Sequence, residues 1–337
     1  MQEKDYKKII KKIDKYIAER KYWSSFDDEV EALRADIRKA KKYGKRNPEA
    51  VKNKIRYAVN IMPVKEDTGE LLRYYLAFNN RDMELLNDYL FEIAHAKQLS
   101  LILKTGADHG LFGMNTSPYL LAANMMNDVK LLLPKENGLA AYKHVCTPVA
   151  NLLMAILYDD LEFSQKAIEQ AQKEMTKKIA VYDCLHIDCM LAILQKDYNH
   201  FNEVINNYCE AYKKSRDPFQ GALAKQFVIE AHGMYNLARY AFNGEMKEKI
   251  ELPEADNFCQ ELAIWQNEHN NVVGKIRHIY PEDLNFYNRF MMSKPVEMHL
   301  ITIPKEEETL VHNGTVTDND RYLKDLISEN GWNIDFT

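Results

Sequence analysis

The chain has 337 residues, of which 46% are hydrophobic and 28% charged, and it contains only 12 glycines and 10 prolines. A chain of this length can bury a large core, and the scarcity of helix-breaking residues favours an all-helical protein. No apolar run approaches the roughly 18 residues of a membrane span, so the sequence excludes a protein that crosses a membrane through helices.

The net charge of −5 is unevenly distributed along the chain. Residues 1–60 contain 18 Lys and Arg against 10 Asp and Glu, whereas residues 251–337 contain 7 against 16. Either the two ends complement each other within the molecule, or the acidic end presents a surface to a basic partner. The N-terminus lacks the apolar segment of a signal peptide, and the five cysteines fall mostly in helical apolar patterns. We therefore expect a cytoplasmic protein with reduced thiols.

The N-terminal region predicts three helices. Residues 2–21 form a basic amphipathic pattern with isoleucines at spacings of three and four. Such a helix can bind a membrane surface or nucleic acid, but its four acidic residues favour docking onto the rest of the chain. A second helix is predicted from an N-cap at Ser24 or Ser25 to a C-cap at Gly44, and a third from Pro48 to before Pro63. Residues 1–62 are therefore expected to pack on the remainder as basic N-terminal helices.

Residues 63–292 are expected to form a domain of repeated helical hairpins. MAILYDDLEFSQKAI (Met154–Ile168) aligns without a gap with LAILQKDYNHFNEVI (Leu191–Ile205), and LAFNNRDMELLNDYL (Leu76–Leu90) is a third copy. Weaker copies start at Leu121 and Leu237. Each copy predicts a helix, a short acidic turn and a second helix. Repeats of this kind form stacked hairpins, so the sequence predicts a divergent, α-solenoid-like array.

The turns carry a recurrent aspartate, and its position has a physical meaning. Asp160 and Asp197 align with each other, and Asp82 matches them in the third copy. A carboxylate at this point accepts hydrogen bonds from the free backbone N–H groups at the start of the next helix. These aspartates are therefore predicted to be helix caps and not catalytic acids.

Residues 293–337 differ from the repeats and are expected to cap the end of the array. MHLITIP (298–304) is β-like, and HNGT (312–315) contains an Asn-Gly turn. A last short helix is predicted over residues 318–330, before Gly331 and Trp332. The fold expected for the whole chain is thus all-α with a small β-like or irregular C-terminal cap.

Several residue groups were considered for chemistry. Glu92 and His95 form one ExxH, but a di-iron site needs a second ExxH and two more carboxylates. His186, Asp188 and Cys189 could bind zinc, but no second ligand pair is present, so core packing is favoured. Twenty tyrosines, many beside acids, suit either a concave binding surface or ordinary packing between helices.

The glycine-rich stretch TGADHGLFGMNTS (105–117) contains Asp108 and His109, which are the best candidates for a general base. No nucleophile partner, GxSxG or phosphate-binding glycine motif accompanies them, so an exposed loop without chemistry is favoured.

The hairpins resemble those of the all-helical immunity proteins of bacterial polymorphic toxin systems, in particular the immunity protein 49 family. The likeness lies in the pattern LA(I/L)LxxDxxxFxxxI, best kept in Met154–Ile168 and Leu191–Ile205 and looser in Leu76–Leu90. It covers residues 70–240, and no functional residue of the family maps onto this chain. The resemblance implies a cytoplasmic protein that binds and blocks a cognate toxin.

We therefore expect a binding protein that is not an enzyme and that has no catalytic residue, metal site or other cofactor. The first hypothesis is an immunity protein that occludes a basic toxin domain, such as a nuclease, and binds neither nucleic acid nor a membrane. Its expected partner contacts lie in the loops 105–117 and 305–320, at Asp108, His109, Glu306, Glu307, Glu308, Asp318 and Asp320.

Two alternatives remain open. One is a tetratricopeptide-like scaffold or peptide-binding regulatory protein, which would hold an extended peptide in a concave groove. The other is an enzyme that uses Asp108 and His109, or a metal held by Glu92 and His95.

Overall fold

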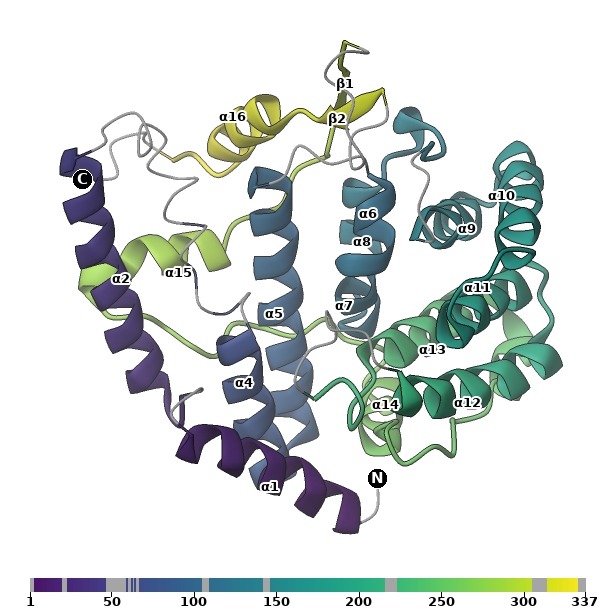
Figure 1. Cartoon of the computed structure of the whole chain (residues 1–337), viewed down its shortest axis with the longest axis horizontal. Helices are drawn as coiled ribbons and strands as arrows, with labels where there is room; N and C mark the ends of the chain where they lie inside the picture. Colours follow the sequence, from purple (N-terminus) through teal and green to yellow (C-terminus); the bar gives the residue numbers. More distant parts are fainter. Residues whose placement is uncertain are drawn as a thin grey trace.

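The computed structural model describes residues 3–19, 23–46, 59, 62, 64, 67–104, 109–141, 146–215, 223–304 and 314–332. Helices dominate these residues (Figure 1), which confirms the all-α prediction. The first half contains α1 (Glu3–Ala18), α2 (Phe26–Arg46), α4 (Asp67–Asn80), α5 (Met83–Lys104), α6 (Gly110–Asn115), α7 (Ser117–Ala122), α8 (Met126–Leu132), η3 (Lys135–Asn137) and α9 (Cys146–Tyr158). The second half contains α10 (Leu161–Met175), α11 (Val181–Leu194), α12 (Tyr198–Lys214), α13 (Ile229–Ala241), η4 (Gly244–Lys249), α14 (Gln260–Glu268), η5 (Glu282–Leu284), α15 (Asn285–Met291), β1 (Leu300–Thr302), β2 (Thr315–Thr317) and α16 (Asn319–Glu329).

The three best repeat copies form helical hairpins, as predicted. They are α4–α5, α9–α10 and α11–α12, and the last two stack through contacts between α9 and α11. Figure 1 shows α9, α10, α11 and α12 together on one side of the molecule. The repeat pattern therefore identified real structural units, although they are not consecutive members of one regular superhelix.

The turns of these hairpins use the predicted aspartates as helix caps. The carboxylates of Asp82, Asp160 and Asp197 accept hydrogen bonds from the backbone N–H three residues later, at 2.9, 3.0 and 3.0 Å. In all three turns the residue before the capping aspartate has a left-handed backbone, and φ is 50° at Arg81, 48° at Asp159 and 60° at Lys196. Asp82 and Asp197 donate their backbone N–H groups to Ala77 and Ala192, which closes a Schellman motif.

The weaker copies at Leu121 and Leu237 are also present, but they pair with each other. Helices α7 and α13 lie side by side although more than 100 residues separate them in the chain. A Cβ added at Gly233 on α13 would lie 2.8 Å from the carbonyl oxygen of Pro118, so the two backbones approach closely only because this residue is glycine. The chain therefore folds back on itself instead of continuing as an open array.

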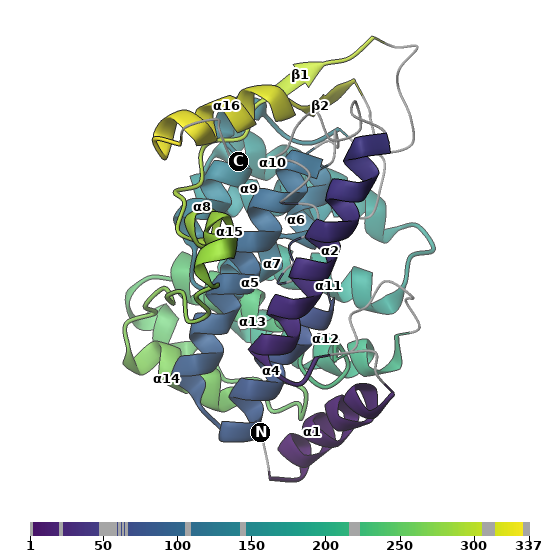
Figure 2. The ribbon, with the colours of Figure 1, turned by 90° about the vertical axis from the view of Figure 1, so that its left-hand side faces the viewer.

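Helix α5 is the central element of the fold. Its side chains are buried on several sides, because α4, α7, α14, α15 and α16 all pack against it. Figures 1 and 2 show α5 running along the length of the molecule, with α2 and α15 on one side and α7 on the other. The buried side chains of α5 therefore include polar ones, among them Asn87, Glu92 and Gln98, as well as apolar ones.

The N-terminal helices dock onto this core. Helix α1 buries Tyr6, Ile9 and Ile13 and packs on α4, which confirms the predicted docking. Ser25 caps α2, because its hydroxyl accepts a hydrogen bond from the N–H of Asp28 at 3.2 Å, and the Asp28 carboxylate accepts one from Ser25 N–H in return. The predicted stop at Gly44 is wrong, because α2 continues to Arg46. The predicted third helix from Pro48 lies almost entirely outside the described residues.

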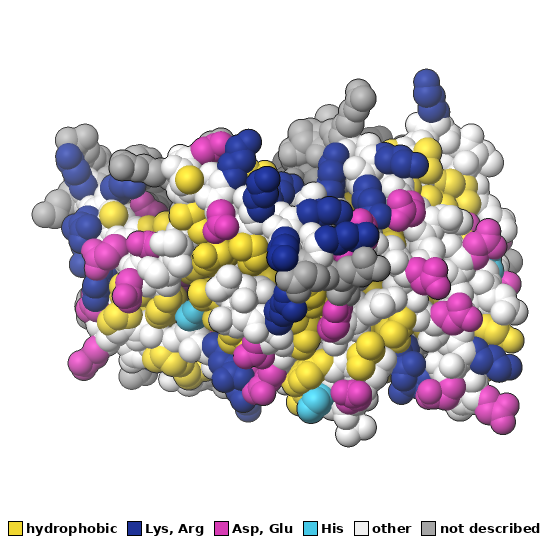
Figure 3. Space-filling model, turned by 90° about the horizontal axis from the view of Figure 1, so that it is seen from below, with side chains coloured by type: hydrophobic (Ala, Val, Ile, Leu, Met, Phe, Trp, Pro, Cys, Tyr) yellow, Lys and Arg dark blue, Asp and Glu magenta, His cyan; other side chains and the backbone are white. Residues whose placement is uncertain are grey.

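The docked α1 leaves its lysines on the lower surface. Lys and Arg side chains gather there, as Figure 3 shows. The exposed lysines of α1 are Lys4, Lys7, Lys8, Lys11 and Lys15. Because the apolar face of α1 is buried, its exposed face contributes positively charged side chains to this surface and no stripe of apolar ones.

The C-terminal segment forms a separate small cap at the opposite end of the molecule (Figure 1). Strands β1 and β2 pair antiparallel, with Ile301 opposite Val316, and α16 packs on α5. The last helix agrees with the prediction, since Asp318 is its N-cap and Gly331 follows with φ of 59°. Trp332 lies against Phe290, with 6.3 Å between ring centroids.

Candidate functional site

Three of the seven predicted partner contacts can be placed. Asp108, Glu306, Glu307 and Glu308 lie outside the described residues. His109 precedes α6 and is only 2% exposed, with its Nε2 2.9 Å from the carbonyl oxygen of Gly138. The expectation of an exposed loop is therefore wrong for His109, whose ring joins two chain segments inside the molecule.

The other two predicted contacts are at the start of α16. The carboxylate of Asp318 accepts a hydrogen bond of 3.0 Å from Arg321 N–H, so it acts as a helix cap. Asp320 is exposed in the first turn. Of these two residues, only Asp320 presents its side chain mainly to solvent.

The residues considered for metal binding are placed in the core. Glu92 and His95 are 1% and 2% exposed, and burial lowers the pKa of His95 to about 4. His186 is also buried, with its pKa lowered by burial to about 4, and burial raises the pKa of the Cys189 thiol. Asp188 points elsewhere and lies 3.0 Å from His200. Within the described residues, no group of three or more His, Cys, Asp or Glu side chains could hold a metal ion.

Three of the tyrosines belong to buried polar clusters. The hydroxyls of Tyr74 and Tyr119 donate to Glu70 at 3.0 and 3.1 Å, and that of Tyr212 donates to Glu230 at 2.8 Å. Burial raises the pKa of Glu230, and the neighbouring charge of Glu70 raises it further. These three tyrosines therefore agree with the prediction of ordinary packing between helices.

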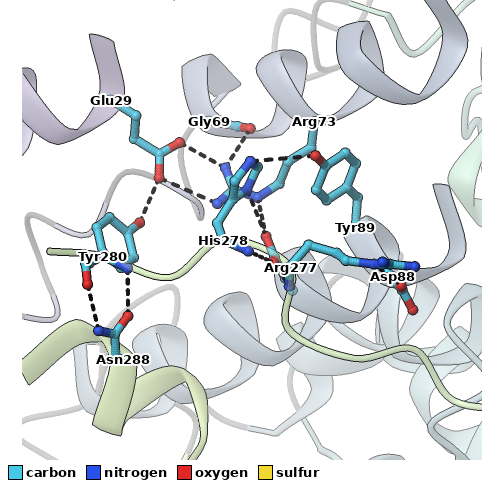
Figure 4. A network of polar contacts seen from close by, with 10 residues as sticks. Glu29, Gly69, Arg73, Asp88, Tyr89, Arg277, His278, Tyr280 and Asn288 are labelled. Atoms are coloured by element: carbon cyan, nitrogen blue, oxygen red, sulfur yellow. Dashed lines mark hydrogen bonds and ion pairs between the residues drawn. The ribbon is translucent and has the colours of Figure 1, made fainter. Parts of the chain in front are cut away.

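A buried ion network surrounds Arg73 (Figure 4). Arg73 on α4 is 1% exposed. Its Nε donates to Glu92 of α5 at 2.7 Å, and its Nη1 donates to Glu29 of α2 at 2.8 Å and to the carbonyl of Gly69 at 3.0 Å. One guanidinium therefore ties three helices together.

The segment 272–280 completes this network by crossing α5. Glu92 also accepts hydrogen bonds from the backbone N–H groups of Arg277 and His278, at 2.6 and 2.8 Å. The Tyr280 hydroxyl donates to Glu29 at 2.6 Å. A Cβ at Gly274 would lie 2.7 Å from the carbonyl oxygen of Asn87 on α5, so glycine allows the segment to lie directly on that helix.

The electrostatics of the network are those of a satisfied structural cluster. Burial alone would raise the pKa of Glu92, but the charge of Arg73 and the hydrogen bonds from His278 hold that pKa at about 2. The His278 ring is stacked between Phe26 at 4.3 Å and Tyr89 at 5.0 Å. Each group thus has several partners inside the protein, and the network positions α2 and the 272–280 segment on the α4–α5 hairpin.

The sequence analysis did not identify this network. Its members come from four separate segments, and Arg73 and Glu29 are 44 residues apart. The one available signal is Glu92, a carboxylate among the otherwise apolar residues 89–94 of the predicted helix.

Two surfaces remain as candidates for binding. The lower surface has a groove of about 240 Å³ lined by Lys8, Lys213, Lys225 and other polar residues. The opposite end presents the outer side of α16 and β1. No helix in the described part of the chain is long and apolar enough to cross a membrane.

Comparison of the chain with models of protein families, with curated proteins and with solved structures found no match.

Proposed function

We propose that the chain is an immunity protein that binds a cognate protein toxin and neutralises it by occlusion. The observation that carries this proposal is that the repeated hairpins are packed together and that their catalytic-type side chains are buried. Glu92, His95 and His186 are all buried in that array. Such a construction supports a role in presenting a surface to a partner, which is also what the resemblance of the hairpins implies.

The proposed contact surface is the C-terminal end, formed by α16 and β1. Ile301 is 46% exposed there, and the side chains of Asp325 and Glu329 are 42% and 53% exposed. Their ion pairs with Arg321 and Lys294 are long, at 3.5 and 3.9 Å. Exposed pairs of this kind contribute little to stability, so these carboxylates can turn to a basic partner at low cost.

The sequence adds further negative charge to this end of the chain. Residues 293–337 contain nine Asp and Glu against four Lys and Arg. Charge of one sign at an interface accelerates association with an oppositely charged partner and makes the affinity depend on salt. A basic toxin domain, such as a nuclease, is the partner that this charge fits.

The test is binding to the protein encoded directly upstream of this chain's gene. That protein should arrest growth when expressed alone, and co-expression of this chain should restore growth. Reversing Asp320, Asp325 and Glu329 to Lys should weaken the complex by about tenfold or more and abolish protection. The matched control reverses three exposed acids outside the proposed surface, at Glu162, Glu169 and Glu203. Equal losses in both triple variants, or none in either, would overturn the proposed surface.

A scaffold that binds an acidic peptide is the second candidate, and the lower groove favours it. The groove gathers Lys8, Lys213 and Lys225, although Asp256 lies 3.5 Å from the first and 2.5 Å from the second. Burial and the charge of Lys225 together lower the pKa of the nearby Lys12, which indicates crowding of positive charge. Under this alternative, substitution of Lys225 and Lys8 by Glu weakens partner binding, and reversal of the α16 acids does not.

A further inference from the structure

A second cavity, separate from both proposed protein-binding surfaces, is built by the turns of the two weaker repeat copies. It has a volume of about 490 Å³ and is lined by Asn124, Met126, Asn236, Arg239, Tyr240, Phe242, Asn243, Gly244, Lys247 and Asn271. This volume falls within the range of small-molecule sites. Its walls combine apolar and aromatic side chains with amide and cationic groups.

The chain leaves hydrogen-bond donors unsatisfied in this cavity. The Nε of Arg239 and the Nδ2 of Asn124 are buried from solvent, and within the described residues neither has a hydrogen-bond partner. Buried donors of this kind are rare in native structures, because each one costs the free energy of its lost hydration. Two such donors from separate elements lining one cavity indicate a ligand that accepts hydrogen bonds.

The charge of Arg239 is poorly compensated by the protein. Its side chain is 13% exposed, its Nη1 donates weakly to the carbonyl of Lys247 at 3.4 Å, and its contact with Glu248 is 4.0 Å long. Glu248 is itself 75% exposed. Arg73 makes a useful comparison, because that buried guanidinium has two carboxylates within 2.8 Å. Arg239 therefore lacks the close carboxylates that compensate the buried guanidinium of Arg73.

The turns of the two weaker repeat copies offer Arg239 no capping carboxylate. Asn243 occupies the position at which the hairpin from Leu191 has its capping aspartate, Asp197. Asn124, in the turn before α8, has a left-handed backbone with φ of 59°, and it lines the cavity. The N-cap residues that follow these two turns are Met125 and Asn243, so neither turn has a capping carboxylate.

We propose that this cavity binds a small organic carboxylate. The planar guanidinium of Arg239 matches a carboxylate through paired N–H donors, and Asn124 Nδ2 adds a third donor. Met126, Tyr240 and Phe242 provide the apolar wall for the body of the ligand. Lys247 lines the same cavity and adds positive charge. This inference does not rest on the proposed immunity function.

The experiment is titration of the full chain with phenylacetate, and with phenylacetamide as its uncharged counterpart, by isothermal titration calorimetry. Phenylacetate should bind saturably and shift the NMR signal of the Arg239 Nε–H, whereas phenylacetamide should bind at least about tenfold more weakly. Arg239→Gln should weaken phenylacetate binding by roughly tenfold or more.

Two variants keep the test independent of misfolding. Asn124→Gly removes the amide donor but suits the left-handed backbone, so it should fold normally and weaken phenylacetate binding severalfold. Asn270→Gly is the matched control, because Asn270 also has a positive φ, of 55°, and does not line the cavity. Equal binding of acid and amide, absence of saturable binding, or binding of inorganic phosphate in place of phenylacetate would each overturn the carboxylate assignment.

Discussion

Replacement of Glu92 by Gln is expected to remove a defined, pH-dependent part of the stability. Glu92 is 1% exposed, and its pKa of about 2 in the folded chain compares with 4.5 for an unperturbed glutamate. Because each pKa unit corresponds to 1.36 kcal/mol, the charged form of Glu92 stabilises the native state by roughly 3 kcal/mol. Arg73 and the backbone N–H groups of the 272–280 segment provide this contribution. A glutamine at position 92 carries no charge, and its side-chain amide would turn a donor toward the donors of Arg73.

The sign of the pH dependence follows from the lowered pKa. The contribution is complete above about pH 4.5, where the unfolded chain is also ionised, and it is lost as the pH falls toward 2. Glu92→Gln should therefore lower the free energy of unfolding by roughly 3 kcal/mol at pH 7, and the gap to the wild type should close between pH 4.5 and 2.

The assay is urea unfolding followed by tryptophan fluorescence at a series of pH values from 7 to 2.5. The matched control is Glu84→Gln, on the same helix, because Glu84 is half exposed and pairs with Lys275 and Arg277 at the surface. The control should change stability little at any pH. A Glu92→Gln variant that follows the pH dependence of the wild type, or a control that loses as much stability, would refute the role assigned to the network.

Three further variants test other parts of the fold. Burial lowers the pKa of His186 to about 4, so the unfolded chain takes up a proton at this residue before the folded chain does. The wild type should therefore lose roughly 3 kcal/mol of stability between pH 6.5 and 4 through His186, and His186→Phe should remove this loss. Acid titration followed by circular dichroism measures the effect, and an unchanged pH dependence in the variant would count against it. Asp197→Ala should cost about 1 kcal/mol in urea unfolding through loss of the α12 cap, whereas Glu203→Ala on the same helix should cost almost nothing. Gly233→Ala should lower stability by roughly 1–3 kcal/mol, because its Cβ would meet the Pro118 carbonyl; a neutral effect would show that α7 and α13 are less close than described.

Local features of the fold could be predicted from the sequence, because their causes are local. The turn that follows a helix and the aspartate that caps the next one lie within a few residues of each other, as at Asp82 and Asp197. The same holds for α16, where Asp318 and Gly331 mark both ends. Gly44 misled the prediction, because a glycine within a basic stretch does not end a helix by itself.

The long-range features could not be predicted, because their partners are far apart in the chain. Nothing near Arg73 indicates that Glu29 and the 272–280 segment approach it, and the pairing of α7 with α13 depends on how the array folds back. His109 is a similar case. Its glycine-rich surroundings resemble an exposed loop, but Gly138 and the start of α6 enclose it. The partner contacts predicted at Asp108, His109, Asp318, Asp320 and residues 306–308 stay predictions.

The central claim is that the acidic C-terminal end binds and blocks a toxin, and affinity measured against salt tests it most directly. We expect this chain to bind the product of the upstream gene with a dissociation constant that rises steeply with ionic strength. The α16 triple Lys variant should lose both the affinity and most of the salt dependence, whereas the Glu162, Glu169 and Glu203 variant should keep both. Absence of binding, or a salt-independent complex unaffected by reversal of Asp320, Asp325 and Glu329, would contradict the account.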